Sequence, residues 1–175
     1  GKSRVMEVVV SQLTAAGKQV LGVTPSSKAA LNLAEMTGIE VKNSAQWRKI
    51  WQENAGEKFS LELDNNFYKL PEYNHGKSSL TDKHVLIIDE AAMLNLPDLY
   101  YLLSEVRQAN GKAIVIGDNN QLAAIGKKAG FKKICDIAQV SRLNEVIRQR
   151  DGEQAKVTKL LSEYKIGEAI DILWD

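Results

Sequence analysis

Cysteine is almost absent from the sequence, which holds Cys135 alone among 175 residues. A single cysteine excludes an internal disulfide framework and fits the reducing environment of the cytoplasm. Long apolar runs are missing as well, since none approaches the roughly 20 residues of a membrane-spanning helix. There is also no signal-peptide pattern. We therefore expect a cytoplasmic domain that has no membrane partner.

Neither sign of charge is in large excess, because 23 basic and 22 acidic side chains nearly cancel to a net charge of +1. The overall charge therefore neither favours nor opposes a nucleic-acid partner, and any basic surface must be local. The sequence also lacks internal repeats and low-complexity tracts. With 44% apolar residues over its 175 positions, the chain is long enough for one well-cored domain.

The first three residues, Gly1-Lys2-Ser3, match the end of the phosphate-binding loop G-x-x-x-x-G-K-[ST] and directly precede a helical pattern. Glycine lets the backbone approach phosphate oxygens, and a helix N-terminus presents free N–H groups. Lys2 would then reach the β- and γ-phosphates of a nucleotide, and the Ser3 hydroxyl would bind Mg2+. The preceding glycines and strand of this motif are missing, so we expect a piece cut from a longer protein.

The central motif is an apolar strand that ends in two carboxylates. Val85 to Ile88 run without a polar break, which is typical of a strand buried on both faces of a parallel sheet. Asp89 and Glu90 follow at its C-terminal end, where ligands bind in open α/β sheets. On this stretch alone, the acidic pair fits phosphate and metal chemistry or plain capping of the following helix.

Strands alternate with helices along the chain. Besides 85–88, apolar runs predict strands over 19–24 and 112–116, both ending in polar residues and the second again buried. Helical spacing and capping residues predict helices over 3–17, 26–37, 43–52, 97–110 and 131–137. Residues 53–82 are polar and rich in turn signals, which predicts a surface insertion with a short hairpin around 59–63 or 67–70. The alternation predicts an α/β fold with a doubly wound, mainly parallel sheet and one active edge.

Two further groups of residues allow more than one interpretation. Thr24 and Ser27 lie beside Lys28 just after the first predicted strand, where they form a cradle for a backbone phosphate. Capping hydroxyls and a solvated lysine explain the same residues equally well. Trp47 and Trp51 are of a type that stacks on single-stranded bases, but their spacing on one helix face favours the core.

In chain order, the polar strand ends fit the hydrolysis of a nucleoside triphosphate. Mg2+ needs hard oxygen ligands, which Ser3 and Asp89 supply, and Glu90 is the base for the attacking water. Gln121 follows a neighbouring strand and would report the γ-phosphate. Arg148 would neutralise the charge that develops on the transferred phosphoryl group.

With these motifs the chain resembles the first RecA-like motor domain of a superfamily-one DNA helicase. Within that superfamily it resembles the branch of RecD and the conjugative relaxase-helicases, and TraA-type conjugal transfer proteins in particular. The segments that carry the resemblance are Gly1–Ser3 (motif I), Thr24–Ala30 (motif Ia), Ile88–Met93 (motif II), Gly117–Ile125 (motif III) and Leu143–Gln149 (motif IV).

The resemblance implies a three-layer RecA-like P-loop NTPase domain over residues 1–175, with its first strand and most of its P-loop truncated. It implies ATP and Mg2+ as cofactors and single-stranded DNA as a partner, contacted through Thr24, Pro25, Ser27 and Lys28. A second RecA-like domain and a relaxase domain are implied for the longer protein. The implied function is a 5′-to-3′ helicase motor in conjugative DNA transfer or recombination.

Two other functions compete with this one. The truncated loop leaves open a non-catalytic structural or DNA-binding module, which would be inactive alone. A small kinase is disfavoured by the segment Gly-Asp-x-x-Gln-Leu and by the lack of an arginine cluster typical of a lid. Four lysines near position 130 either contact a DNA backbone or form a solvated face, namely Lys127, Lys128, Lys132 and Lys133.

Overall fold

The computed structural model describes residues 2–55, 62–64, 67–69, 78–118 and 128–141, together with Lys156 and Leu160. The chain divides into two compact units, Met6–Gln139 and the pair Gly1–Val5 with Val140–Asp175. Every described strand lies in the first unit. A single domain over residues 1–175 therefore stays a prediction.

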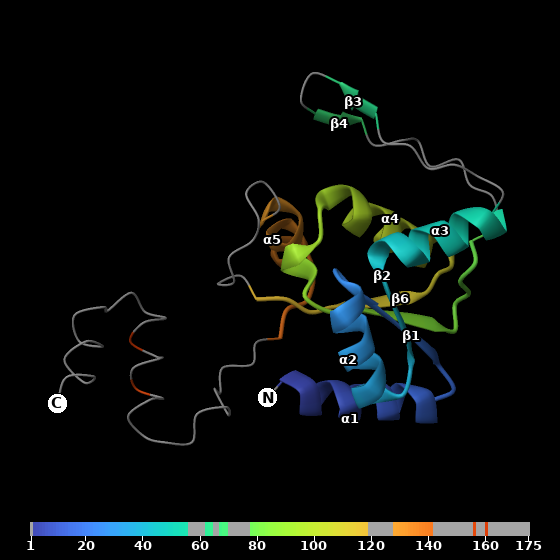
Figure 1. The fold of residues 1–175 in the computed structure, drawn as a ribbon, viewed down its shortest axis with the longest axis vertical. Coiled ribbons are helices and arrows are strands. Elements are labelled where there is room, and N and C mark those ends of the chain that lie inside the picture. Colours follow the sequence, from blue (N-terminus) through green and yellow to red (C-terminus); the bar gives the residue numbers. More distant parts are fainter. Residues whose placement is uncertain are drawn as a thin grey trace. The chain divides into compact units, whose positions relative to one another are not determined.

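The secondary structure is mostly the alternation that the sequence predicts (Figure 1). The elements are, in chain order, α1 (Lys2–Ala15), β1 (Gln19–Thr24), α2 (Ser27–Thr37), β2 (Glu40–Asn43), α3 (Ser44–Ala55), β3 (Glu62–Asp64), β4 (Phe67–Lys69), β5 (His84–Ile88), the 3-10 helix η1 (Ala91–Met93), α4 (Leu96–Gln108), β6 (Lys112–Val115) and α5 (Lys128–Ile137). Across the part of the chain that the structure covers, no helix is long and apolar enough to cross a membrane.

Four parallel strands form the main sheet in the order β2-β1-β5-β6. Successive side chains of a strand point to opposite faces. Accordingly, Leu86 and Ile88 pack with residues of α3, α4 and α5, whereas Ile87 packs with residues of α1 and α2. The helices thus cover both faces of the sheet (Figure 1). The predicted three-layer α/β fold with a parallel sheet is confirmed.

Strand β5 is the centre of this arrangement. Val85 to Ile88 are each at most 2% exposed, as the unbroken apolar run predicts. Burying such a side chain fully is worth about 1.5–3 kcal/mol. The strand therefore gives a rigid base to the residues that follow it, Asp89 and Glu90.

The two outer strands differ from the prediction. Residues 112–116 were expected to be a buried strand, but β6 is only partly buried. Among the described strands it pairs with β5 alone, so one of its edges has no neighbour there. Strand β2 was not predicted at all, because Glu40 and Lys42 alternate with less polar residues in a run of only four. Charged side chains are common on such edge strands.

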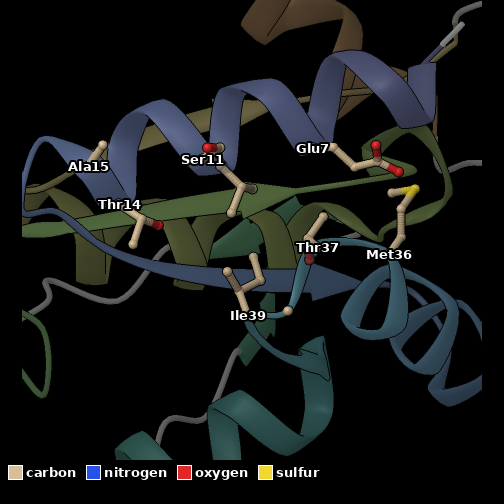
Figure 2. A pocket seen from close by; sticks show the side chains of 9 residues that line it. Glu7, Ser11, Thr14, Ala15, Met36, Thr37 and Ile39 are labelled. Carbon is tan, nitrogen blue, oxygen red and sulfur yellow. The ribbon is translucent and has the colours of Figure 1, made fainter.

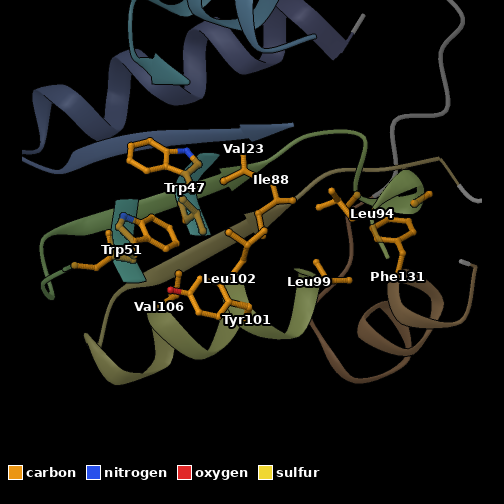
Figure 3. Close-up of a cluster of buried hydrophobic side chains, with 14 residues drawn as sticks. Val23, Trp47, Trp51, Ile88, Leu94, Leu99, Tyr101, Leu102, Val106 and Phe131 are labelled. Carbon is orange, nitrogen blue, oxygen red and sulfur yellow. The ribbon is translucent and has the colours of Figure 1, made fainter. Parts of the chain in front are cut away.

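Helix α3 is fixed to the core by its two tryptophans (Figure 3). Trp47 and Trp51 are 4% and 3% exposed, and their rings stack with centroids 5.2 Å apart. Trp51 in turn stacks on Tyr101 of α4 at 6.3 Å. The Nε1 group of Trp47 donates a hydrogen bond of 2.8 Å to the carbonyl oxygen of Gly22. The core interpretation of the tryptophans is therefore confirmed, and neither ring is free to stack on a base.

The helix boundaries follow capping rules. Ser26 caps α2 by accepting a hydrogen bond from the amide of Ala29, and Gly38 ends it in the left-handed conformation at φ 70°. Asn95 caps α4 by accepting from the amide of Asp98, and Pro97 lies in its first turn as predicted. These local signals explain why the helix positions could be predicted closely.

The predicted surface insertion of residues 53–82 contains a hairpin. Helix α3 extends into it as far as Ala55, three residues beyond the predicted end. Strands β3 and β4 pair antiparallel, with Leu63 opposite Tyr68. The sequence offered two alternative places for a hairpin, and the structure pairs strands from both.

Candidate functional site

The carboxyl ends of the four parallel strands bring several polar residues to one edge of the sheet. Thr24 of β1 is in register with Asn43 of β2, and Val23 is in register with Ile88. Beyond the last residue of β5, the amide of Asp89 donates to the Val23 carbonyl at 2.9 Å. In open α/β sheets this edge is where ligands bind.

Asp89 and Glu90 form a tight turn at the end of β5. The Asp89 Oδ1 atom accepts a hydrogen bond of 2.9 Å from the Glu90 amide. Glu90 has φ 52° and ψ 37°, a left-handed conformation that costs a non-glycine residue about 1–2 kcal/mol. The amide of Ala91 then donates to the Ile116 carbonyl, which ties the turn to the end of β6.

The turn does not behave as a simple helix cap. Glu90 is the N-cap residue of η1, yet its side chain makes no capping hydrogen bond. Both carboxylates are partly exposed at the sheet edge. Strained backbone is often found at functional sites. The Glu90 side chain therefore gives no support to the capping alternative, whereas Asp89 does bond a backbone amide of the turn.

The segment from Thr24 to Lys28 lies at the end of the neighbouring strand. Thr24 is only 1% exposed, and its hydroxyl donates to the Ser26 carbonyl at 2.8 Å. The hydroxyl of Thr24 is thus used to shape the turn, and its predicted contact with DNA stays a prediction. Ser27 and Lys28 are exposed, and Pro25 is partly exposed.

Asn43 and Asp98 are polar residues of this edge whose contacts the sequence did not reveal. The Asn43 side chain donates to the Ser27 hydroxyl at 2.9 Å. Asp98, which is 9% exposed, accepts from Ser44 at 3.1 Å and pairs with Arg48 at 2.8 Å. The sequence signal was limited to Asn43 or Ser44 as a cap of the helix predicted over 43–52, since nothing local points to partners so far along the chain.

Other predicted site residues have no described side chain. Gly1, Gln121 and Arg148 lie outside the described residues, as does Lys127. Lys2 and Ser3 begin α1, but the structure describes only their backbone. Their predicted roles at a phosphate and a metal ion therefore stay predictions.

Helix α5 packs beside the start of the predicted motif III. A side chain at Gly117 would bring its Cβ to 2.7 Å from the ring of Phe131. Phe131 is 7% exposed and belongs to the larger core cluster (Figure 3). Lys132 and Lys133 of the same helix are exposed, which is compatible with either interpretation of the lysine group.

A pocket in the described surface lies on two helices, α1 and α2. This pocket of about 350 Å³ opens between α1 and the end of α2 (Figure 2). Glu7, Ser11 and Thr14 line it from α1, Thr37 lines it from the end of α2, and Ile39 lines it from the connection to β2. Neither Asp89 nor Glu90 lines it. Within the described ranges, no three acidic, histidine or cysteine side chains gather as a metal cluster.

Comparison with known proteins adds the following relationships. A family model described as an AAA domain matches residues 1–175. A probable conjugal transfer protein TraA of Sinorhizobium fredii is 25% identical over 171 residues, 98% of this chain and 14% of the relative. The RecBCD enzyme subunit RecD of Buchnera aphidicola is 42% identical over 59 residues, 34% of this chain and 10% of the relative. The chain therefore spans only a small part of these relatives.

Solved structures of Bacteroides Pif1 share the fold. A complex of this protein with ADP-AlF4 has a TM-score of 0.54 and 17% identity, and the match covers 97% of this chain and 42% of that one. Bacteroides Pif1 bound to single-stranded DNA has a TM-score of 0.55 and 17% identity, with 99% of this chain and 43% of that one covered. At this identity the likeness establishes the fold.

Proposed function

The chain belongs to the AAA domain family, as a helicase-type motor domain related to the TraA, RecD and Pif1 proteins, and we propose on this premise that it binds and hydrolyses ATP to move single-stranded DNA. The longer protein would be a DNA helicase of 5′-to-3′ polarity that acts in conjugative transfer or recombination. The TraA relatives favour the first of these two settings.

The observation that carries the proposal is the strained acidic turn at the end of β5. A hydrogen bond from the Glu90 amide fixes the orientation of the Asp89 carboxylate. Glu90 has an unfavourable backbone conformation, although its side chain does not cap η1. In this proposal Asp89 is a ligand of Mg2+, through water or directly, and Glu90 accepts the proton of the attacking water.

The chemistry of the available donors fits a magnesium nucleotide. Mg2+ takes hard oxygen ligands and usually keeps several waters, so one carboxylate and the Ser3 hydroxyl suffice on the protein side. Gly1 and Lys2 hold the phosphates, Gln121 reports the γ-phosphate and Arg148 neutralises its developing charge. Bound Mg2+ neutralises the phosphate oxygens, while the residues of this chain orient the nucleotide and hold the attacking water.

The proposed DNA contact is the exposed turn before α2. Pro25, Ser27 and Lys28 occupy this turn, and Lys28 offers a positive charge to a backbone phosphate. Thr24 contributes indirectly, since its buried hydroxyl holds the turn through Ser26. The complex of Pif1 with single-stranded DNA supports this class of partner.

The test is turnover of ATP by the natural protein that carries residues 1–175, with and without single-stranded DNA. Glu90→Gln should lower kcat by about 10²- to 10⁴-fold, the contribution typical of a general base, and should leave nucleotide binding intact. Glu53→Gln is the matched control, because this carboxylate is exposed on α3 and far along the chain from β5.

Two results would contradict the proposal. Unchanged turnover in Glu90→Gln would remove Glu90 as the base. Binding of DNA by the wild-type protein without any binding or turnover of ATP would favour the non-catalytic DNA-binding module.

A further inference from the structure

The N-terminus of α3 contacts the proposed DNA turn through one amide side chain. Asn43 Nδ2 donates to Ser27 Oγ at 2.9 Å. The Oδ1 atom of the same amide accepts from the Gln46 backbone amide at 2.9 Å, and Gln46 Oε1 accepts from the Asn43 amide at 3.0 Å. This reciprocal capping box holds the Asn43 side chain against α3. A displacement of Ser27 must therefore move the start of α3 or break this contact.

Ser44, the next residue of the chain, contacts the segment that follows Glu90. Ser44 Oγ donates to Asp98 Oδ2 at 3.1 Å, and Asn95 Nδ2 donates to the same oxygen at 3.1 Å. Arg48 pairs with the other carboxylate oxygen at 2.8 Å. Ser44 and Asp98 are 7% and 9% exposed, so the contacts are largely shielded from water. Removing a donor from a buried carboxylate is costly, which keeps the starts of α3 and α4 together.

Only η1 and Leu94 separate Asn95 from Glu90 of the acidic turn. The amide of Met93 donates to the Glu90 carbonyl at 2.9 Å, and the amide of Leu94 donates to the Ala91 carbonyl at 3.2 Å. Asn95, the cap of α4, follows directly. The connection from Asp98 back to Glu90 is thus short and hydrogen-bonded.

We propose that Asn43, Ser44 and Asp98 are positioning residues that couple occupancy of the DNA turn to the acidic turn at Asp89 and Glu90. The proposal rests on the proposed function of both turns. Engagement of Ser27 and Lys28 by a DNA backbone shifts the start of α3 through Asn43. Ser44 passes the shift to Asp98 and Asn95, and η1 passes it to Glu90. Coupling of this kind must be reciprocal, so nucleotide binding changes DNA affinity by the same factor.

A purely structural role makes a different prediction. If the cluster only stabilises the fold, its variants lower the melting temperature but leave the linkage between the two ligands unchanged. The decisive quantity is therefore the ratio of two dissociation constants for a single-stranded oligonucleotide, one measured without nucleotide and one with Mg2+ and a non-hydrolysable ATP analogue. It is measured in the natural protein that carries this chain.

Ser44→Ala removes one donor to Asp98 and leaves the Asn43 capping box in place. We expect this variant to move the ratio toward one by about three- to tenfold, the equivalent of one buried hydrogen bond. The nucleotide-free dissociation constant should stay within about twofold of wild type, as for an uncoupled site.

Ser78→Ala is the matched control. Its hydroxyl also donates to a carboxylate of α4, the buried Glu105, at 3.0 Å, but at the opposite end of the helix. This variant should lower the melting temperature and keep the wild-type ratio.

A second variant keeps the test decisive if Ser44→Ala fails to fold. Asn95→Ser removes the amide donor to Asp98 and retains a residue that caps helices well. Asn95→Ser alone should also move the ratio toward one, and a wild-type ratio in this variant would overturn the coupling. Where Ser44→Ala does fold, the two links lie in series, so the double variant should reduce the ratio no further than either single variant. Reductions that multiply would indicate independent effects and would overturn the coupling.

The outcomes separate this inference from the proposed function. A wild-type protein that fails to bind DNA or nucleotide contradicts the proposed function itself. A wild-type protein that binds both with a ratio of one, or a Ser44→Ala variant with the wild-type ratio, overturns only the coupling.

Discussion

The Nε1 group of Trp47 donates a hydrogen bond of 2.8 Å to the carbonyl oxygen of Gly22, and this contact joins helix α3 to the central part of the sheet. Both residues are buried. A carbonyl oxygen in such a place loses its partner at a cost of about 1–3 kcal/mol. The position of α3 is therefore defined by a specific polar contact as well as by apolar packing.

Replacing Trp47 by phenylalanine tests this contact. Trp47→Phe should destabilise the fold by about 1–3 kcal/mol, because the Gly22 carbonyl loses its donor while an aromatic ring remains over Trp51. Denaturant unfolding measures the loss. Trp51→Phe is the matched control, because it removes another buried indole from the same helix and leaves the Gly22 carbonyl with its donor. Equal losses in the two variants would contradict the assignment.

Gly22 should not tolerate a larger residue while Val41 lies opposite it on β2. The Cβ atom of an alanine at this position would lie 2.7 Å from Val41 Cγ2. Gly22→Ala should therefore cost about 1–3 kcal/mol through overpacking between β1 and β2. Adding Val41→Ala should recover part of the loss in thermal unfolding, because it removes the opposing methyl groups. A double variant less stable than Gly22→Ala alone would refute this explanation.

Because the backbone of Glu90 is strained, replacing this residue by glycine should raise the stability of the fold and abolish activity. Glu90→Gly should relieve the left-handed conformation and stabilise the fold by about 1 kcal/mol, while ATP turnover is lost. Asn110, at φ 51°, is the other non-glycine residue with positive φ in the described chain. Asn110→Gly should bring a similar rise in melting temperature with turnover intact. If both variants retained turnover, Glu90 would have no catalytic part.

The exposed lysine of the DNA turn should act through its charge. Lys28→Ala should weaken binding of a single-stranded oligonucleotide and reduce the slope of log K against log salt by about 0.7, the value for one phosphate contact. Lys49 of α3 is the control, since its side chain is 77% exposed and pairs only loosely with Glu53 at 3.9 Å. A slope unchanged by Lys28→Ala would remove this residue from the DNA contact.

Sequence reasoning succeeded where the signal is local. The apolar run from Val85 to Ile88 marks β5 because every residue of a central parallel strand faces a helical layer. The start of α2 could be predicted because a capping serine bonds an amide three residues away, and the start of α4 could be predicted because Pro97 favours the first turn of a helix. The motif at Asp89 and Glu90 follows directly from such a strand.

Sequence reasoning failed where the partners of a side chain lie far along the chain, and where pairing with a neighbouring strand determines the structure of a short segment. The contact from Ser44 to Asp98 spans 54 positions, and no local pattern encodes it. Strand β2 has one apolar residue, Val41, in a run of four at a sheet edge, a pattern too short to separate from a loop. The sequence placed Thr24 in a cradle for a backbone phosphate or as a capping hydroxyl, and it did not reveal that the hydroxyl donates to the Ser26 carbonyl.

Gly117 has a consequence for how relatives of this chain are compared. The residue stands at the head of the polar segment assigned to motif III, where a glycine is easily credited to nucleotide chemistry. Yet the space beside it is filled by the ring of Phe131, so a side chain at 117 and the ring at 131 would compete for the same volume. A larger residue at 117 is tolerable only where 131 carries a smaller one. Retention of this glycine among relatives would thus record how α5 docks, and it would be no measure of catalytic competence.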